Sequence, residues 1–336
     1  MSSYTKGLTT LAALVLVSGA AGAATITVPT GDSLPAALDA AAPGDVLQLS
    51  PGVYAGDLDF GGKAVTVVGV GPETILMGSG AGSVVRFASG EGPASVLDSV
   101  AVTGGFADRG GGIHIADASP TVLRTVVVGN RAVLQGSGIY VARSHAVLSN
   151  SVLAYNATGG GDPHALEIVD AGPVVVNNTI ARNDSNGIIL RGSSPADIRN
   201  NVIVSNGSRG RGRGICDFSG GLARIHYNLF WQNRVAALLT NGVDFRRVGG
   251  AERAIGLPRL VGNLDANPRF VGRRLPSLGN AGALTTTPAE IADAARLDPS
   301  VPRPNAVDAG DPSSEHADRD GSRNDLGHTG GPNAAG

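Results

Sequence analysis

Asparagine recurs at nearly constant intervals through the middle of this chain, and this repeat limits the possible folds more than any other sequence feature. Each of these residues closes a short apolar run, and successive positions lie 26, 27, 23 and 27 residues apart: Asn130, Asn156, Asn183, Asn206 and Asn233. A sustained period of this length is the signature of a repeat architecture, because unrelated loops would not share one spacing. The repeat therefore predicts a solenoid with units of about 25 residues.

A second polar column lies five residues before the first: Thr125, Ser151, Asn178, Asn201 and Asn228. Residues of these types bond the backbone at bends and tolerate left-handed conformations. Each unit also holds three short strands, and because none can bury its own apolar face, the units are stable only when stacked. We therefore predict an all-β, right-handed parallel β-helix. Its stacked amides form structural ladders inside the coil: Asn156, Asn178, Asn183, Asn201, Asn206, Asn228 and Asn233.

Composition supports this prediction and removes several classes of function. Hydrophobic residues make up 42% of the chain and aromatic residues only 4%, so the core must be a series of thin aliphatic layers. The β-branched strands and glycine-rich breaks exclude an α-helical solenoid. A net charge of −2 argues against a nucleic-acid partner. Cys216 is the single cysteine, which excludes a disulfide framework and cysteine-based zinc sites.

The first 24 residues have the features of a signal peptide. Lys6 precedes an apolar run from Leu8 to Val17, and small residues follow up to Ala24. This run is too short to span a bilayer, and no later run is long enough either. We therefore expect an exported protein, periplasmic or extracellular, with no membrane span once the leader is removed.

The remaining chain divides into three predicted regions. Residues 25–60 form an N-terminal cap and first coil, in which Ser33 caps a short helix. Residues 61–275 form the β-helix. Residues 276–336 form a loop-rich C-terminal cap or tail that contains one short helix, capped by Thr287.

Three segments outside the repeat resemble a known group of proteins. They read SLPAALDAAAPGDVLQLSPGVYAGDLDFGGKAVTVVGVGPETILMG near the start, NLDANPRFV after the repeat, and LDPSVPRPNAVDAGDP with DRDGSRNDLGHTGGP near the end. The chain resembles the exported bacterial right-handed parallel β-helix repeat proteins of the pectate-lyase-like superfamily, over about residues 25–332. The resemblance implies the fold and an association with polysaccharide. Because these motifs lie in caps, turns and ladders, they imply little about activity.

Enzymes of that superfamily act along an outer strand face, so the resemblance implies a site where outward side chains gather. The outward column of the third strand carries a histidine, a phenol and a carboxylate that should be vertical neighbours, and these groups could supply an acid, a base and sugar contacts. The predicted catalytic residues are His114, Tyr140, Glu167 and Arg191. The predicted substrate-binding residues are Asp162, His164, Arg143 and Asp170. The alternative is that these side chains are simply a solvated outer face.

A short C-terminal segment alternates oxygen-bearing side chains with turn residues, as calcium loops do. The candidate ligands are Asp318, Asp320, Ser322, Asn324 and Asp325. The spacing is not that of an EF-hand, because the glycine is misplaced and no glutamate closes the loop. Calcium is therefore one possible cofactor, and the alternative is a turn in which these side chains bond their own backbone.

Arginine alternates with glycine in the segment SRGRGRG, at Arg209, Arg211 and Arg213. Such a loop could contact an anionic glycan or a single-stranded nucleic acid. Because no aromatic residue is interleaved and the chain carries net negative charge, we favour a solvated loop.

Two functions from different classes remain. The first is an exported, non-catalytic scaffold that binds a polysaccharide or cell-surface glycan through its strand faces. The second is a polysaccharide lyase or glycoside hydrolase. A calcium-dependent lyase needs several carboxylates on adjacent coils, and a hydrolase needs a pair of them, whereas the central column offers only Glu167. We therefore favour the scaffold, with the enzyme as the alternative.

Overall fold

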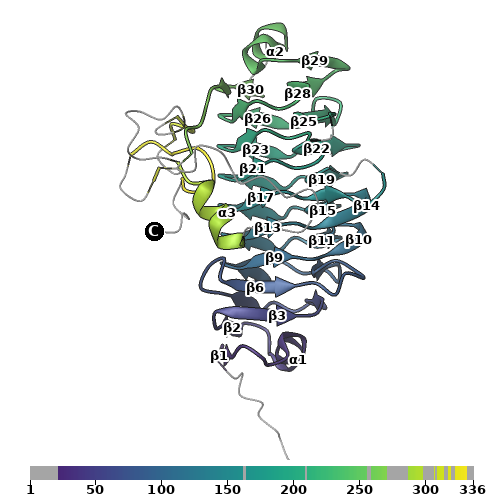
Figure 1. Cartoon of the computed structure of the whole chain (residues 1–336), viewed down its shortest axis with the longest axis vertical. Coiled ribbons are helices and arrows are strands. Elements are labelled where there is room, and N and C mark those ends of the chain that lie inside the picture. The colour runs from purple at the N-terminus through teal and green to yellow at the C-terminus, as the bar shows by residue number, and fades with distance from the viewer. Residues whose placement is uncertain are drawn as a thin grey trace, which may run out of the picture.

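The structure is a computed structural model that describes residues 22–161, 164–208, 210–255, 259–270, 287–297, 306, 309–313, 317–318 and 322–330. Within these residues the chain winds as a coil whose turns stack strands into three long sheets (Figure 1). Sheets A, B and C have ten, nine and nine strands in this part of the chain, and successive coils pair in parallel. The fold is the parallel β-helix that the repeat predicts.

The strands of the three long sheets alternate along the chain. Sheet A contains β1 (Thr25–Val28), β2 (Val46–Leu49), β5 (Thr66–Val68), β8 (Val96–Asp98), β12 (Thr121–Leu123), β16 (Val147–Ser149), β20 (Val174–Val176), β23 (Asp197–Arg199), β26 (Arg224–His226) and β30 (Leu260–Val261). Sheet B contains β3 (Gly52–Ala55), β6 (Thr74–Met77), β9 (Ala101–Thr103), β13 (Val126–Val128), β17 (Val152–Ala154), β21 (Thr179–Ala181), β24 (Val202–Val204), β27 (Leu229–Trp231) and β31 (Leu264–Asp265). Sheet C contains β4 (Leu58–Asp59), β7 (Val85–Phe87), β11 (Ile113–Ala116), β15 (Ile139–Ala142), β19 (Leu166–Val169), β22 (Ile188–Arg191), β25 (Arg213–Phe218), β28 (Ala236–Thr240) and β29 (Val243–Phe245).

A smaller sheet and three helices lie outside the three long sheets. Sheet D contains β10 (Phe106–Arg109), β14 (Arg131–Gln135) and β18 (Ala157–Thr158), which follow strands of sheet B and precede strands of sheet C. The helices are α1 (Leu34–Ala40), α2 (Val248–Ile255) and α3 (Pro288–Ala294). The repeat does not predict sheet D or α2, because both lie in the connections between repeated strands.

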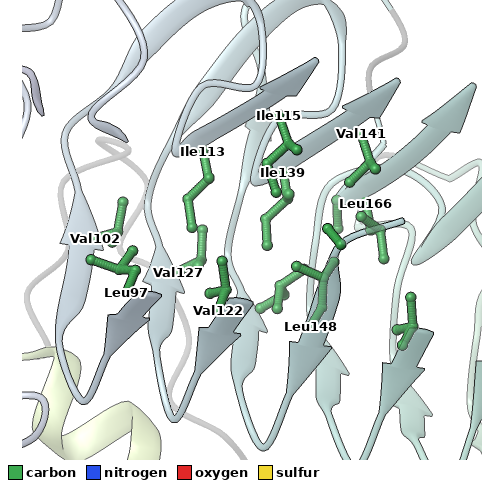
Figure 2. Packing of buried hydrophobic residues seen from close by; sticks show 14 of the residues in the cluster. Leu97, Val102, Ile113, Ile115, Val122, Val127, Ile139, Val141, Leu148 and Leu166 are labelled. Carbon is green, nitrogen blue, oxygen red and sulfur yellow. The ribbon is translucent and has the colours of Figure 1, made fainter. Parts of the chain in front are cut away.

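The core is a stack of aliphatic layers inside the coil, and Figure 2 shows part of it. Strand pairing aligns one inward side chain per coil in sheet A: Val122, Leu148, Val175, Ile198 and Ile225. It does the same in sheet B: Val127, Leu153, Ile180, Ile203 and Phe230. Each of these side chains is at most 2% exposed. A layer buries its apolar surface only against the layers above and below, so the stacked coils stabilise one another.

The two asparagine columns form hydrogen-bonded ladders. At a typical rung, Asn183 Oδ1 accepts from the backbone N–H of Asn156 at 2.9 Å and from its Nδ2 at 3.1 Å. The same contacts link Asn183 to Asn206 and Asn206 to Asn233. Because the side chains from Asn130 to Asn206 are buried, these bonds satisfy turn amides that solvent cannot reach. The second ladder follows the bend between sheets A and B through Asn178, Asn201, Asn228 and Asn263.

Helices cover both ends of the coil (Figure 1). Ser33 Oγ accepts from the N–H of Ala36 and caps α1, which buries Leu34 and Leu38 over the first coil. At the other end, α2 buries Val248 and Ala251 against the same core. These helices shield apolar layers that would otherwise face water.

The C-terminal segment packs along the side of the coil instead of over its end (Figure 1). Thr287 and Glu290 form a capping box at the start of α3, whose Ile291 packs in an apolar cluster with the outer face of sheet B. Asn150 Nδ2 donates to the carbonyl of Gly330 at 2.6 Å. The outer face of sheet B is therefore covered in these coils.

Most of the predicted leader, residues 1–21, lies outside the described residues. Among the helices that the structure describes, none is both long enough and apolar enough to cross a membrane.

Candidate functional site on the outer face of sheet C

The outer face of sheet C carries the side chains that the sequence selected for catalysis. Strand pairing places three of them at successive positions of one column, His114, Tyr140 and Glu167, and Arg86 of β7 precedes them in that column. Arg191 lies at the end of the next strand, β22, two positions beyond the column. Neighbours in such a column lie about 4.8 Å apart. The vertical order that the repeat predicted for His114, Tyr140 and Glu167 is therefore present.

Glu167 is fully buried, although it points out of the coil. Its Oε1 accepts from Gln135 Nε2 at 2.9 Å and from Arg191 Nε at 2.8 Å. Its Oε2 accepts from the backbone N–H of Gly136 at 3.2 Å. Sheet D causes this burial, because Gln135 ends β14 and the following turn passes over sheet C. Glu167 therefore holds neighbouring groups in place and does not face solvent as a solvated outer residue would.

Tyr140 lies beside Glu167 and is also buried. The guanidinium of Arg109 lies over its ring at 5.9 Å, and the centroid of the His114 ring is 5.3 Å away. Burial raises the pKa of the Tyr140 phenol. A phenol in this environment remains protonated at neutral pH. Tyr140 therefore contributes packing and a hydroxyl dipole to this face, and it does not act as a base.

His114 is the half-buried member of the column. Its Nδ1 lies 3.2 Å from the carbonyl oxygen of Arg109, and since a carbonyl only accepts, Nδ1 carries the proton. Burial lowers the pKa of His114, and the charges of Arg86 and Arg109 lower it further. The ring is therefore neutral at pH 7, and Nε2 is its proton acceptor.

A cavity of about 260 Å³ lies in front of His114. It is lined by Gly82, Ser83, Arg86, Ala107, Asp108, Arg109 and His114. Arg86 forms an exposed ion pair with Asp59 at 3.4 Å, and Arg109 Nε donates to Gln135 Oε1 at 2.6 Å. The cavity thus presents two guanidinium groups, one carboxylate and a neutral imidazole.

One chain of hydrogen bonds joins this cavity to the centre of sheet C. It runs from Arg109 through Gln135 and Glu167 to Arg191. The guanidinium of Arg191 then lies 5.9 Å from the ring of Phe218, which is 48% exposed. The face therefore combines fixed cations with an exposed aromatic ring, which is a surface suited to sugars that carry a negative charge.

The predicted substrate-binding residues are not gathered around the cavity. Arg143 lies in the bend after β15 and makes two 2.6 Å bonds to Asp117. Asp170 lies in the next bend, and its Oδ1 accepts from the N–H of Ser193. His164 precedes β19, is buried, and has Nδ1 3.0 Å from Ser185 Oγ. Asp162 lies outside the described residues.

The candidate calcium loop lies against the bend between sheets A and B. Asp318 Oδ2 accepts from the N–H of Asp325, and Asn324 Oδ1 accepts from Asn177 Nδ2 at 2.8 Å. The first contact closes the loop on itself, and the second attaches it to the coil. Ser322 is described and Asp320 is not. Within the described ranges, no group of three or more His, Cys, Asp or Glu side chains has an arrangement that could hold a metal ion.

The sequence missed three residues of this face: Arg86, Arg109 and Gln135. Arg86 precedes the regular asparagine repeat, although it occupies the same strand position as His114. Arg109 and Gln135 belong to sheet D, whose strands have no counterpart in the later coils. The alternation of inward and outward residues in β7 could have revealed Arg86. No pattern in the sequence shows where the strands of sheet D lie.

Comparison with known proteins supports the fold. Residues 97–247 match the family described as right handed beta helix region. The crystal structure of pectate lyase Pel9A aligns with a TM-score of 0.52 and 16% identity, over 92% of this chain and 96% of that chain. A mannuronic acid specific polysaccharide family 6 lyase from human gut microbiota aligns with a TM-score of 0.31 and 14% identity, over 72% of this chain and 73% of that chain. No curated protein matches the sequence.

Proposed function

We propose that this pectate-lyase-like β-helix protein is a scaffold that binds an acidic polysaccharide along the outer face of sheet C. The observation that carries the proposal is the cavity beside His114, where Arg86 and Arg109 form one cationic wall. Guanidinium groups bind carboxylates through charge-assisted hydrogen bonds, and Arg109 is already oriented by Gln135. We expect a uronate carboxylate to bind at this wall.

The environment of Glu167 and Tyr140 favours binding over bond cleavage. Both side chains are buried, and both carboxylate oxygens of Glu167 already accept hydrogen bonds. A general acid or base must reach the atom whose proton it transfers. These two residues therefore support Arg109 and Arg191 from beneath the surface.

A polysaccharide lyase is the second candidate, and His114 is the observation that favours it. A neutral imidazole with Nε2 as acceptor can remove the proton next to a uronate carboxylate. The adjacent guanidinium groups of Arg86 and Arg109 would stabilise the charge that develops on that carboxylate. The C–O bond to the leaving sugar then breaks, its oxygen takes up a proton, and an unsaturated uronate remains.

A binding assay with polygalacturonate tests the first proposal. We expect saturable binding that weakens about tenfold or more in Arg86→Gln and in Arg109→Gln, because each substitution removes a charge-assisted hydrogen bond. Arg224→Gln is the matched control, since Arg224 is exposed on sheet A. Neutral dextran should not bind. Equal binding by all variants would show that this face is not the site.

The same samples distinguish the scaffold from the lyase. Polygalacturonate and alginate are incubated with the protein, with and without added calcium, while unsaturated uronate absorbance and new reducing ends are followed. The scaffold predicts no product in either assay. Absorbance that appears with the natural chain and disappears in His114→Gln would establish the lyase instead.

A further inference from the structure

A second cavity, of about 320 Å³, lies near the C-terminal end of the coil, where β27 turns into β28. Figure 1 shows β28 and α2 at this end. Its lining includes Trp231, Asn233, Arg234, Arg246 and Arg247. The cavity lies five strands of sheet C away from His114, so it is separate from the site described above.

The charge of this cavity is strongly positive. Arg234, Arg246 and Arg247 are exposed, and in the described part of the chain none of them lies within salt-bridge distance of a carboxylate. Asp265 is the one acidic lining residue, and its Oδ1 accepts from the N–H of Val248 at 3.1 Å. Unpaired guanidinium groups that face a common space attract an oxyanion.

The glycine-rich arginine loop lies next to this cavity. The N–H of Val235, a lining residue, donates to the carbonyl of Gly212 at 2.7 Å. The N–H of Arg234 donates to the carbonyl of Asn206. The loop that the sequence singled out, which carries the exposed Arg211, therefore follows the edge of the cavity.

The end of one asparagine ladder opens into the cavity. Along this ladder each asparagine N–H donates to the Oδ1 of the next asparagine, but Asn233 is the last, and no described residue accepts from its N–H. The other ladder ends differently, because Glu252 Oε1 accepts from the N–H of Asn263 at 2.9 Å and from its Nδ2 at 3.1 Å. A carboxylate thus completes one ladder, whereas none of the residues that the structure describes supplies the equivalent acceptor at Asn233.

We propose that this cavity binds an anionic sugar unit. Its carboxylate or sulfate oxygens would contact Arg234, Arg246 and Arg247, and one oxygen would accept from the N–H of Asn233. The half-buried indole of Trp231 provides an apolar wall for the sugar ring. The volume suits one or two sugar units.

Trp231 is the only tryptophan of the chain, so its fluorescence reports on this cavity directly. The probes are trigalacturonate, a sulfated heparin disaccharide and neutral maltotriose. We expect a saturable fluorescence change with at least one anionic probe and none with maltotriose. The affinity should fall about tenfold or more in Arg246→Gln/Arg247→Gln and in Arg234→Gln. The preferred anionic probe shows whether carboxylate or sulfate is the ligand.

Two controls separate this proposal from the site on sheet C. Arg253→Gln removes an exposed arginine of α2 outside the cavity, and Arg86→Gln removes one from the other site. Both should keep the fluorescence response. Absence of a saturable change in the natural chain up to roughly 10 mM probe would overturn the proposal. An unchanged response in both cavity variants, or an equal response to maltotriose, would overturn it as well.

Discussion

On the outer face of sheet C, one buried side chain fixes the orientation of exposed ones. Glu167 connects Gln135 of sheet D to Arg191 of sheet C, and through Gln135 it orients Arg109. A buried carboxylate in low-dielectric surroundings is stable only when donors surround it. Two of its three donors, Gln135 and Gly136, also tie the end of β14 in sheet D to the coil.

Replacing Glu167 with Gln should therefore reduce the free energy of unfolding by about 2 kcal/mol. The amide nitrogen of glutamine is itself a donor, so it cannot accept the hydrogen bond that one carboxylate oxygen of Glu167 accepts. Chemical denaturation measures the change. Glu73→Gln, at an exposed position, is the matched control and should lie within about 0.5 kcal/mol of the natural chain. If the two variants are equally stable, the donors around Glu167 are not structurally important.

The stability that an asparagine contributes depends on its position along the ladder. Asn183 receives two hydrogen bonds from Asn156 and donates to Leu153, Ala181 and Asn206, and it is fully buried. Asn183→Ala should lower the free energy of unfolding by about 3 kcal/mol, because it leaves buried backbone groups without partners. Asn233→Ala, at the partly exposed end of the same ladder, should cost clearly less. Equal losses by denaturation would contradict a ladder whose stability comes from burial.

At the scale of elements, the C-terminal segment is attached to sheet B through a titratable contact. His328 Nδ1 lies 3.0 Å from Thr179 Oγ1, and Thr179 Oγ1 accepts from the N–H of His328. Burial first, and then the nearby charge of Arg296, lower the pKa of His328 to about 4 against the opposing effect of a hydrogen bond to the backbone of Ala292. The contact therefore favours the neutral ring.

This contact predicts that acid loosens the segment. The unfolded chain binds a proton at His328 near pH 6.5, and the folded chain does so only near pH 4. The stabilisation that the neutral His328 ring gives to the folded chain is therefore complete above pH 6.5. It is lost as the pH falls toward 4, and the loss in the free energy of unfolding is at most about 3 kcal/mol. Hydrogen exchange of α3 between pH 7 and pH 4 measures it. His328→Gln should flatten this pH dependence, and an unchanged profile in that variant would assign the effect to another group.

At the scale of the whole molecule, the coil is one continuous core that must be closed at both ends. Open strands at the end of such a stack would pair with another copy. α1 covers the first coil with Leu34 and Leu38, and α2 covers the last one with Val248 and Ala251.

Leu38→Lys should therefore expose the first coil and cause concentration-dependent association, which light scattering after size-exclusion chromatography detects. Ala36→Lys places the same charge on the exposed side of α1 and should leave the size unchanged. A Leu38→Lys variant with the size of the natural chain would show that α1 is not needed to block end-to-end pairing.

The sequence by itself determined the coil and the stacking of its columns. Each repeat position recurs at the same place in the next coil, so strand pairing follows from the period, and His114, Tyr140 and Glu167 become neighbours. The caps at Ser33 and Thr287 were readable for a similar reason, since capping depends on residues only three positions apart.

Only the tertiary structure decided which of these residues are buried and which line a cavity. Sheet D folds over Glu167 and brings Arg109 to His114, and its strands lie in connections that the period does not govern. The attachment of Gly330 to Asn150 joins residues 180 positions apart. Such contacts depend on how connections pack against a completed coil, which no local pattern of residues encodes, whereas the coil follows from spacing alone.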